Sequence, residues 1–272
     1  MKFTIVTPCR NAEAHLRETM ESVLSQKALA AGRVQLEYIV CDGASTDGTL
    51  DIARSFQDDR IRISSMPDNG MYEALARGLQ MATGDVVAYL NASDLYYPTT
   101  FDVVTDIMSA HDVTWLTGHS VGVTEQSVQF SCRLPFRYRR RLFETGAYGN
   151  VLPFVQQEGT FWRRSLMDSV DFDRLARWRM AGDYFLWLSF ARSAQLSIAA
   201  SSLGAFKFHA GRLSEDLAAY RDEVHGMTRR MTATDRIVAA FDQALWFAPR
   251  PVKKYFNRRH LFLFDRAREQ WS

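Results

Sequence analysis

The first hundred residues alternate between short apolar runs and segments in which apolar residues recur every three or four positions. Apolar, β-forming runs occupy residues 2–8, 35–41, 61–63 and 86–90. Helical spacing is found in the segments between and after these runs, at residues 16–24, 50–56, 71–82 and 101–109. We expect Asn11 to cap the first helix. Alternation of this kind predicts a parallel sheet with right-handed crossovers.

Beyond residue 110 the pattern becomes less regular, and no internal repeat or low-complexity linker marks a sharp boundary. Short strands are predicted at 113–118, 128–130 and 203–208, and a loop or short helix at 133–148. Residues 183–194 are apolar almost all round, which is typical of a buried helix. Further helices are predicted from residues 163–168 and over residues 214–248.

The composition indicates a globular protein but says little about its binding partners. The chain has 272 residues, of which 47% are hydrophobic and 24% charged, as in ordinary globular domains. It has no apolar run of 18 residues, and the first apolar stretch ends by Arg10, so we expect neither a spanning helix nor a signal peptide. The three cysteines are far apart, which fits a reducing compartment without a zinc site. We therefore expect a cytoplasmic protein, with no nucleic acid among its partners.

Three aspartates fall where strands end or helices begin: Asp42, Asp94 and Asp183. Each could have a purely structural role, as a turn residue, a loop carboxylate or a helix cap. A parallel sheet, however, gathers the first two at one edge, where ligands bind in open α/β folds. A divalent cation prefers oxygen ligands, so Asp94 with a phosphate group would suit one. No Walker A loop and no G-x-G-x-x-G follows the first strand, which excludes the common nucleotide motifs.

Several motifs then occur in a characteristic order. They are Thr7-Pro8 with Asn11, YIVCDGASTDGT at 38–49, Asp68-Asn69-Gly70, ATGD at 82–85, LNASD at 90–94, Gln157, Thr160-Phe161, AGDY at 181–184 and Phe208-His209. Together they resemble family-2 glycosyltransferases over residues 1–209, most of all bacterial enzymes that build surface polysaccharides.

The resemblance implies a GT-A fold: an α/β structure with a mostly parallel, mixed sheet flanked by helices, here followed by a helical C-terminal extension. It implies a nucleotide-sugar-binding half (1–110), an acceptor-binding half (111–212) and a basic, aromatic extension (213–272). The implied activity is inverting transfer of a hexose or N-acetylhexosamine from a nucleotide diphosphate sugar, with UDP favoured by family analogy alone. The cofactor would be Mn²⁺ or Mg²⁺, and the acceptor a glycan or a lipid-linked molecule.

Roles carry over from the family residue by residue. Asp94 matches the metal-binding aspartate, and Asp183 the general base that takes a proton from the acceptor hydroxyl. The remaining candidates are assigned to substrate binding: Thr7, Pro8 and Asp42 for the base and ribose, with Glu13 as a weaker candidate, then Asn69, Gly70, Asn91, Ser93, Gln157 and His209. His209 has a structural reading too, as a histidine that ends a strand.

Two departures from the family pattern bear on the chemistry. Members commonly carry a second carboxylate beside the one at Asp94, where this chain has Asn91 and Ser93. The usual glutamate before the base is Gly182 here. An aspartate that caps a helix has its ionised form favoured, so we expect Asp183 to be a weak base.

Two further segments leave alternatives open. Gln156, Gln157 and Glu158 precede Thr160 and the aromatic residues Phe161 and Trp162, a combination that suits a sugar or a loop over an aromatic core. Residues 250–264 interleave cations with aromatic and aliphatic residues. This segment either lies on an anionic membrane surface or packs its rings on the core, and arginines 137–141 could extend the same face.

Two other functions compete with the leading one. A sugar-phosphate nucleotidylyltransferase would need a glycine-rich loop after the first strand, which residues 7–11 lack. A catalytically weak protein that binds nucleotide sugars without turnover is favoured only by Ser93 and Gly182.

Overall fold

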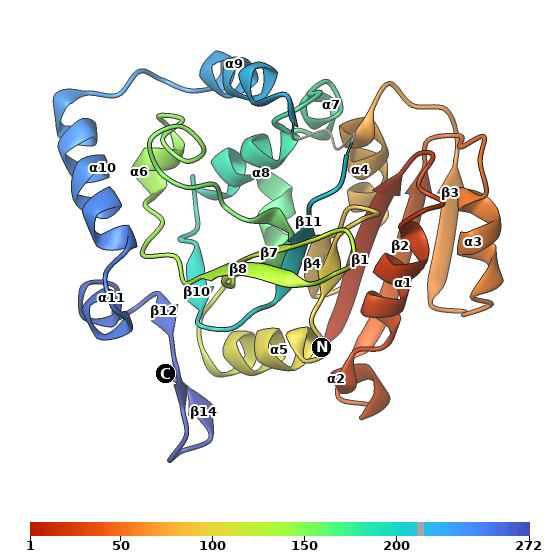
Figure 1. Ribbon diagram of the computed structural model, residues 1–272, viewed down its shortest axis with the longest axis horizontal. Coiled ribbons are helices and arrows are strands. Elements are labelled where there is room, and N and C mark those ends of the chain that lie inside the picture. Colours follow the sequence, from red (N-terminus) through yellow and green to blue (C-terminus); the bar gives the residue numbers. More distant parts are fainter. Residues whose placement is uncertain (211–214) are drawn as a thin grey trace.

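A mixed sheet forms the centre of the protein (Figure 1), as the computed structural model describes it for residues 1–210 and 215–272. In the described residues it has eight strands in the order β12-β10-β6-β9-β4-β1-β2-β3. Their bounds are β1 (Lys2–Cys9), β2 (Gln35–Asp42), β3 (Ile61–Ser65), β4 (Val86–Tyr89), β6 (Trp115–Thr117), β9 (Phe161–Arg163), β10 (Ser197–Ala199) and β12 (Leu261–Phe262). Strand β9 runs antiparallel to its neighbours β4 and β6, and the other pairings are parallel. The predicted mostly parallel, mixed sheet is confirmed.

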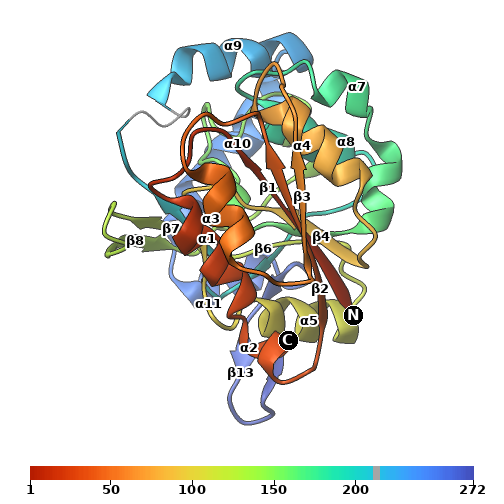
Figure 2. The same ribbon diagram turned by 90° about the vertical axis from the view of Figure 1, so that its right-hand side faces the viewer.

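Helices cover both faces of this sheet. In the first half these are α1 (Leu16–Leu24), α2 (Lys27–Ala30), α3 (Thr49–Ser55), α4 (Met71–Gln80) and α5 (Thr100–Ala110). In the second half they are α6 (Arg140–Phe143), α7 (Phe172–Leu175) and α8 (Gly182–Phe190), with 3₁₀ helices η1 (Gln157–Gly159) and η2 (Arg164–Ser169). Helices α1 and α3 lie on one side of strands β1 to β3, and α4 lies on the other (Figure 2).

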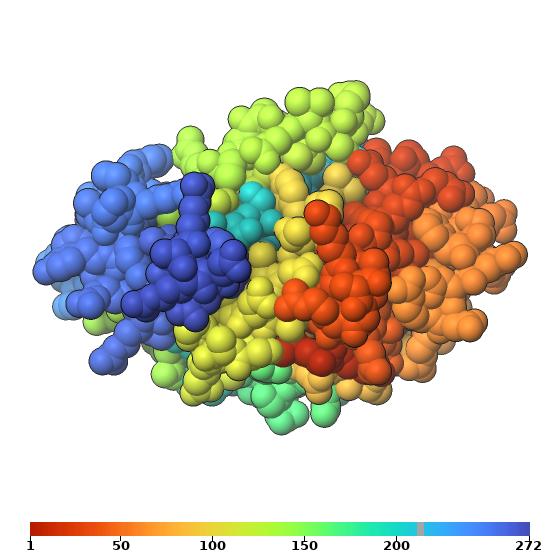
Figure 3. All heavy atoms as spheres, turned by 90° about the horizontal axis from the view of Figure 1, so that it is seen from below, coloured from red at the N-terminus to blue at the C-terminus, as the bar shows by residue number. Residues whose placement is uncertain are grey.

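A smaller sheet brings the second half of the chain against the end of β4. Its order is β5 (Leu95–Tyr96), β11 (Gly204–Lys207), β7 (Ser120–Val123) and β8 (Gln129–Arg133). The β7–β8 hairpin stands out from the body (Figure 3, green). Because β5 begins directly after Asp94 and pairs with β11, this sheet places residues around 205 beside that aspartate.

The C-terminal extension consists of α9 (Leu217–Met227), α10 (Ala233–Trp246) and α11 (Arg250–Phe256), followed by β12 and a hairpin of β13 (Phe264–Asp265) and β14 (Gln270–Trp271). The prediction of continuous helix over 214–248 is wrong, since α9 and α10 are separate; Ser214 itself lies outside the described residues. Helix α10 starts at a capping box in which Thr232 and Asp235 satisfy each other's backbone amides. Among the described helices, none is long and apolar enough to cross a membrane.

Asn11 does not cap the first helix, which begins at Leu16 with His15 as its N-cap. Its backbone has a φ of 49°, the left-handed region that asparagine tolerates better than most residues. Its side-chain oxygen accepts a hydrogen bond from the backbone amide of Thr46 (2.9 Å). Asn11 therefore ties the loop after β1 to the loop after β2.

Strands β9, β10 and β12 were not predicted, and residues 163–168 form the end of β9 and a 3₁₀ helix rather than the start of an α-helix. Each of the three strands has only two or three residues, too few to show a period. Phe161 and Trp162 of β9 are fully buried in the aromatic core. These two rings therefore cannot form a sugar platform, and the alternative of an aromatic core is correct.

Candidate functional site

Asp94 is held at the carboxyl edge of the main sheet by three elements. Its side chain is 1% exposed. One carboxylate oxygen accepts a hydrogen bond from the backbone amide of Lys207 in β11 (2.9 Å), and the other accepts one from Nδ2 of Asn91 (3.3 Å). The hydroxyl of Thr19 in α1 donates to the Asp94 carbonyl oxygen (2.9 Å). The position of this carboxylate is thus fixed before any ligand binds.

A second buried carboxyl, Glu158 of η1, lies beside Asp94. It is 4% exposed, and its Oε2 has no hydrogen-bond partner among the described residues. Burial and the charge of Asp94 both raise the pKa of Glu158, and burial raises the pKa of Asp94. Gly204 allows this approach, because a Cβ there would lie 2.2 Å from the Glu158 carbonyl oxygen. A second buried carboxyl therefore comes close to Asp94 from a distant segment of the chain, and not from residues 91–94.

Two other predicted residues join this pair. Nδ2 of Asn91 also donates to Oε1 of Gln157 (3.2 Å), and Gln157 donates from Nε2 to the carbonyl oxygen of Tyr89. Oδ1 of Asn91 is buried and has no partner in the described part of the chain. Ser93 is partly exposed in the same loop. The structure therefore brings together Asn91, Asp94 and Gln157.

This donor set suits a hard divalent cation. Asn91 Oδ1 and Glu158 Oε2 are two buried oxygens that have no hydrogen-bond partner within residues 1–210 and 215–272, and both lie near the carboxylate of Asp94. Oxygen ligands of this kind are what Mg²⁺ and Mn²⁺ take. The described residues contain no group of three or more His, Cys, Asp or Glu side chains that could hold a metal. An ion here would need further oxygens, as from a diphosphate.

Asp183 lies in the first turn of α8, and Ala181 rather than Asp183 is the N-cap. Its Oδ1 accepts a hydrogen bond from the Tyr184 amide (2.7 Å) and its Oδ2 accepts one from the hydroxyl of Tyr220 in α9 (3.4 Å). Burial outweighs these bonds and raises the pKa of Asp183 to about 7. The expectation of a weak base is wrong, because desolvation dominates over the helix terminus. A carboxylate with this pKa suits general-base catalysis near neutral pH.

The glycine before Asp183 has a steric explanation. A Cβ at Gly182 would lie 2.3 Å from Cδ1 of the buried Tyr72 ring. Tyr72 also donates from its hydroxyl to the carbonyl oxygen of Met180 (3.0 Å). The aromatic ring therefore occupies the space that a longer side chain at position 182 would need.

Helix α9 fixes the backbone that leads into α8. The carboxylate of Glu223 accepts hydrogen bonds from the amides of Arg179 (3.0 Å), Met180 (2.9 Å) and Ala181 (2.8 Å). Together with Tyr220, it makes α9 a clamp on the segment that carries Asp183. No sequence motif marked Tyr220 or Glu223, since their partners lie about forty residues earlier in the chain.

The residues predicted to contact the base and ribose lie at the ends of the first two strands. The side chains of Thr7 and Pro8 belong to the buried strand β1, and the Thr7 hydroxyl lies 3.0 Å from that of Tyr38. Their contact with a base stays a prediction. Asp42, also fully buried, accepts hydrogen bonds from Ser45 and from the Ser65 hydroxyl (2.7 Å).

Loops at the same edge are braced by carboxylates. Glu13 Oε2 accepts a hydrogen bond from the Gly48 amide (2.7 Å). Glu73 Oε2 accepts hydrogen bonds from the backbone amide of Asn69 (2.8 Å) and from its side-chain amide (2.9 Å). Gly70 has a φ of 146°, which favours glycine. Glu13, Asn69 and Gly70 therefore shape the two loops that follow β2 and β3.

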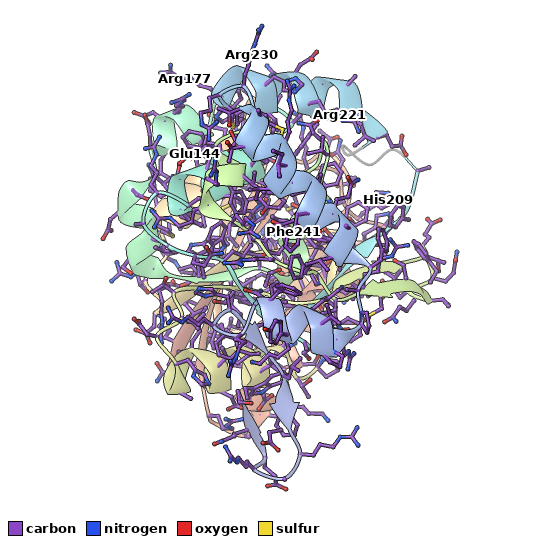
Figure 4. The ribbon with its side chains drawn as sticks, turned by 90° about the vertical axis from the view of Figure 1, so that its left-hand side faces the viewer. Glu144, Arg177, His209, Arg221, Arg230 and Phe241 are labelled. Carbon is purple, nitrogen blue, oxygen red and sulfur yellow. The ribbon has the colours of Figure 1, made fainter. Side chains whose placement is uncertain are left out.

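His209 lies after β11, on the side shown in Figure 4. Its ring centroid is 4.6 Å from that of His15, and its Nδ1 is 2.9 Å from the Ala210 carbonyl oxygen. The neighbouring Lys207 is buried and forms an ion pair with Glu18 of α1. The role of His209 in substrate binding stays a prediction.

Comparison with known proteins gives the chain a family. The model of the family described as Glycosyl transferase family 2 matches residues 4–170. A PGL/p-HBAD biosynthesis glycosyltransferase of Mycobacterium tuberculosis is 30% identical over 186 residues. That alignment covers 67% of this chain and 66% of the relative, so the chain spans slightly less than two thirds of the relative's length.

Solved structures show the same fold. S. aureus TarS 1-349 in complex with UDP is similar with a TM-score of 0.62 at 16% identity, over 94% of this chain and 74% of that one. Glucosyl-3-phosphoglycerate synthase from Mycobacterium tuberculosis, in complex with Mn²⁺, UDP and phosphoglyceric acid, is similar with a TM-score of 0.55 at 22% identity. That match covers 82% of this chain and 75% of the synthase. The predicted GT-A fold is confirmed.

Proposed function

Because the chain belongs to glycosyl transferase family 2 and is a glycosyltransferase, we propose that it is an inverting enzyme that moves a hexose or N-acetylhexosamine from a nucleotide diphosphate sugar. The acceptor is the hydroxyl of a glycan or of a lipid-linked molecule in bacterial polysaccharide synthesis. The observation that carries this proposal is the proximity of three carboxyl groups: Asp94 and Glu158 are buried, Asp183 is partly exposed, and the charges of Asp94 and Asp183 both raise the pKa of Glu158. UDP is the proposed nucleotide, supported by the fold shared with a UDP complex of TarS.

In this proposal Asp183 is the general base. The acceptor oxygen attacks the anomeric carbon while the bond from that carbon to the diphosphate oxygen breaks, and the acceptor proton passes to Asp183. A pKa of about 7 leaves the carboxylate substantially ionised at neutral pH yet basic enough to accept a proton. Tyr220 and Glu223 keep Asp183 oriented through the contacts described above. The direct displacement accounts for inversion.

Asp94 is the proposed ligand of Mn²⁺ or Mg²⁺, with Glu158 and Asn91 supplying the two free buried oxygens. When bound, the ion neutralises charge on the leaving diphosphate as a Lewis acid. Two solved structures of the same fold hold Mn²⁺ with a nucleotide, which supports the choice of metal. Gln157 acts on this site by orienting Asn91.

The donor pocket is proposed to lie between the loops that follow β1, β2 and β3. Asp42, Glu13, Asn69 and Gly70 shape these loops, Thr7 and Pro8 lie at the end of β1, and Ser93 lies in the loop that follows β4. We assign His209 to the substrate side, after β11, where its ring lies against that of His15.

Donor hydrolysis tests the proposal. The purified protein is given Mn²⁺ and a panel of UDP, GDP and dTDP sugars, and free nucleotide diphosphate is measured. We expect one donor to be cleaved slowly, and Asp94→Ala to reduce cleavage at least a hundredfold and to abolish the Mn²⁺-dependent rise in melting temperature. Asp59→Ala, at an exposed loop carboxylate, is the matched control and should behave as wild type. If no nucleotide sugar is cleaved or stabilises the protein, the proposed function fails.

A catalytically weak nucleotide-sugar-binding protein is the second candidate, because Ser93 and Gly182 depart from the family pattern. Glu158 and the raised pKa of Asp183 both favour the enzyme instead. The same assay separates the two, since a binding protein would be stabilised by the donor without cleaving it.

We further propose that the protein works at the cytoplasmic side of the plasma membrane, where lipid-linked acceptors are presented. The segment predicted for this contact, residues 250–264, is divided in the structure. Lys253 is buried and donates to the Leu134 carbonyl oxygen, and Leu261 and Phe262 belong to the main sheet. Tyr255 and Phe256 remain exposed.

A further inference from the structure

Helix α10 turns an apolar stripe away from the protein. Its inner side buries Asp235, Ala239, Asp242 and Trp246. Its outer side exposes Ala233, Ile237, Ala240, Phe241 and Ala244, which follow one another at helical spacing. Ile237 is 71% exposed and Phe241 46%, and Figure 4 shows Phe241 on the outer surface of the helix. Large exposed side chains in one stripe indicate an interaction surface.

Aromatic residues of the following segment continue this stripe. The ring of Phe256 in α11 lies 5.8 Å from that of Phe241, and the ring of Tyr255 lies 5.2 Å from that of Phe256. Phe247, just after α10, is 72% exposed. We call the exposed side chains of residues 233–259, which include α10, α11 and the residues next to them, the outer face.

The charge of the outer face is of one sign. Residues 233–264 contain only two acidic residues, Asp235 and Asp242. Both aspartates are fully buried, and each forms ion pairs with arginines. Asp242 forms a bidentate pair with Arg139 (2.6 and 2.7 Å), and Asp235 pairs with Arg141 and Arg229. The exposed ionic side chains of the same stretch are all cations: Arg236, Arg250, Arg258 and Arg259. Buried acids thus leave an outer face that is apolar and cationic.

A groove lies beside the end of α10, and Phe247 of the outer face is one of its lining residues. It has a volume of about 280 Å³ and is lined by residues 149–154, by Arg221 of α9 and by Gln243, Trp246 and Phe247 at the end of α10. The ring of Phe154 in this groove lies 5.4 Å from that of Tyr220, whose hydroxyl donates to Asp183. One wall of the groove therefore contacts the tyrosine that donates to the proposed base.

We propose that the outer face is a docking surface for a lipid bilayer with anionic headgroups, oriented so that the groove beside Phe247 opens toward that bilayer. The stripe supplies apolar side chains of the size that enter the interfacial layer, and the arginines complement the headgroup charge. This inference rests on the proposed function only in naming a lipid-linked acceptor. The docking itself follows from the apolar stripe and the absence of exposed acid in residues 233–264.

Vesicle flotation tests the surface directly. The full chain is mixed with vesicles of phosphatidylglycerol and phosphatidylcholine, or of phosphatidylcholine alone, at low and high NaCl. We expect the partition coefficient to be at least about tenfold larger for anionic vesicles and to fall with salt. The double variant Ile237→Asp/Phe241→Asp should lower it at least about tenfold, because each change removes apolar contact and adds like charge. Val128→Asp, at a 62% exposed position on the β7–β8 hairpin, is the matched control and should bind as wild type.

Three outcomes would overturn the proposal. They are equal binding to both vesicle types, wild-type binding by the double variant, and a dimer in analytical ultracentrifugation that the double variant converts to monomer. In the last case a second copy of the chain covers the outer face. If the double variant melts below the assay temperature, Arg258→Gln/Arg259→Gln replaces it, and it must weaken binding to anionic vesicles at low salt.

Donor hydrolysis in solution separates this inference from the proposed function. The double variant should cleave the donor as wild type does, because its changes lie on the outer face and not in the carboxyl cluster. A protein that binds anionic vesicles but cleaves no donor would refute the proposed function and leave the docking surface standing.

Discussion

Replacing Asp183 by asparagine should stabilise the fold in a pH-dependent way while it removes the base. The structure holds this carboxyl where burial raises its pKa from the ordinary value of 3.8 to about 7. At 1.36 kcal/mol per pH unit, that rise corresponds to a penalty of at most about 4 kcal/mol for keeping the carboxylate ionised in the folded state. Asparagine has nearly the same shape and can still accept the Tyr184 amide bond, so it removes the penalty with little repacking.

The direction of the pH dependence of stability follows from which state, folded or unfolded, binds the Asp183 proton more tightly. Between pH 4 and pH 7 the folded protein keeps Asp183 protonated while the unfolded chain loses the proton, so this group's contribution to stability falls as the pH rises. Below pH 4 both states are protonated and the contribution is present in full. Above pH 7 both are ionised and the loss is complete. The free-energy difference between Asp183→Asn and wild type should therefore be near zero at pH 4, grow through pH 5 and 6, and level off above pH 7.

Urea unfolding at pH 4.5, 5.5, 6.5 and 8, followed by tryptophan fluorescence, measures this difference directly. Donor turnover on the same samples should fall at least a hundredfold in the variant, and the wild-type rate should rise about tenfold per pH unit below pH 7 before it levels off. Asp173→Asn, in the short helix α7, is the matched control and should show no such growth with pH. A stability difference that does not change with pH would refute the claim that burial destabilises the ionised base.

Two further predictions concern the surroundings of the base. Glu223→Ala leaves three backbone amides without their acceptor, so we expect the unfolding free energy to fall by about 1–3 kcal/mol and kcat to fall about tenfold. Glu223→Gln should restore part of both. An unchanged kcat would show that the clamp does not position the base. Gly182→Ala should lower the unfolding free energy by about 1–3 kcal/mol, because it forces a Cβ against the Tyr72 ring. Gly226→Ala in α9 is the control: its new Cβ meets nothing within 4 Å, so the melting temperature should stay unchanged or rise slightly. Equal melting temperatures for the two glycine variants would contradict the steric explanation.

Local sequence patterns were sufficient for the parts of the fold that repeat them. Helix α4, strand β4 and the polar tip at Asp94 follow directly from spacing within residues 67–98, and each lies where it was predicted. The short strands β9, β10 and β12 could not be predicted in this way. They are strands because neighbours from distant parts of the chain pair with them, and two or three residues carry no period of their own.

The site shows the same limit. Asp94 and Asp183 could be found because each belongs to a recognisable motif, and the family pattern then gave them roles. Glu158 was visible in the sequence only as one of several polar residues before an aromatic run, and its proximity to Asp94 depends on the close packing of η1 against Gly204. The pKa of Asp183 was expected to be low on the basis of its place in a helix. Burial, which depends on tertiary packing, reverses that direction.

The C-terminal extension both orients the proposed base and carries the outer face, a combination that the sequence did not predict. Tyr220 and Glu223 of α9 hold the segment that carries the base, while α10 is fixed to the body through its buried aspartates and presents the outer face. Residues 228–232 join the two helices, and the Arg229 side chain pairs with Asp235 of α10 while its backbone amide donates to the Glu144 carbonyl oxygen (2.9 Å). Arg229 therefore ties the segment between α9 and α10 both to α10 and to Glu144. If the bilayer docks as proposed, it would meet the enzyme on the same extension that orients its base, and the distance from membrane to acceptor hydroxyl would be set by α9 and α10 rather than by the nucleotide-binding half.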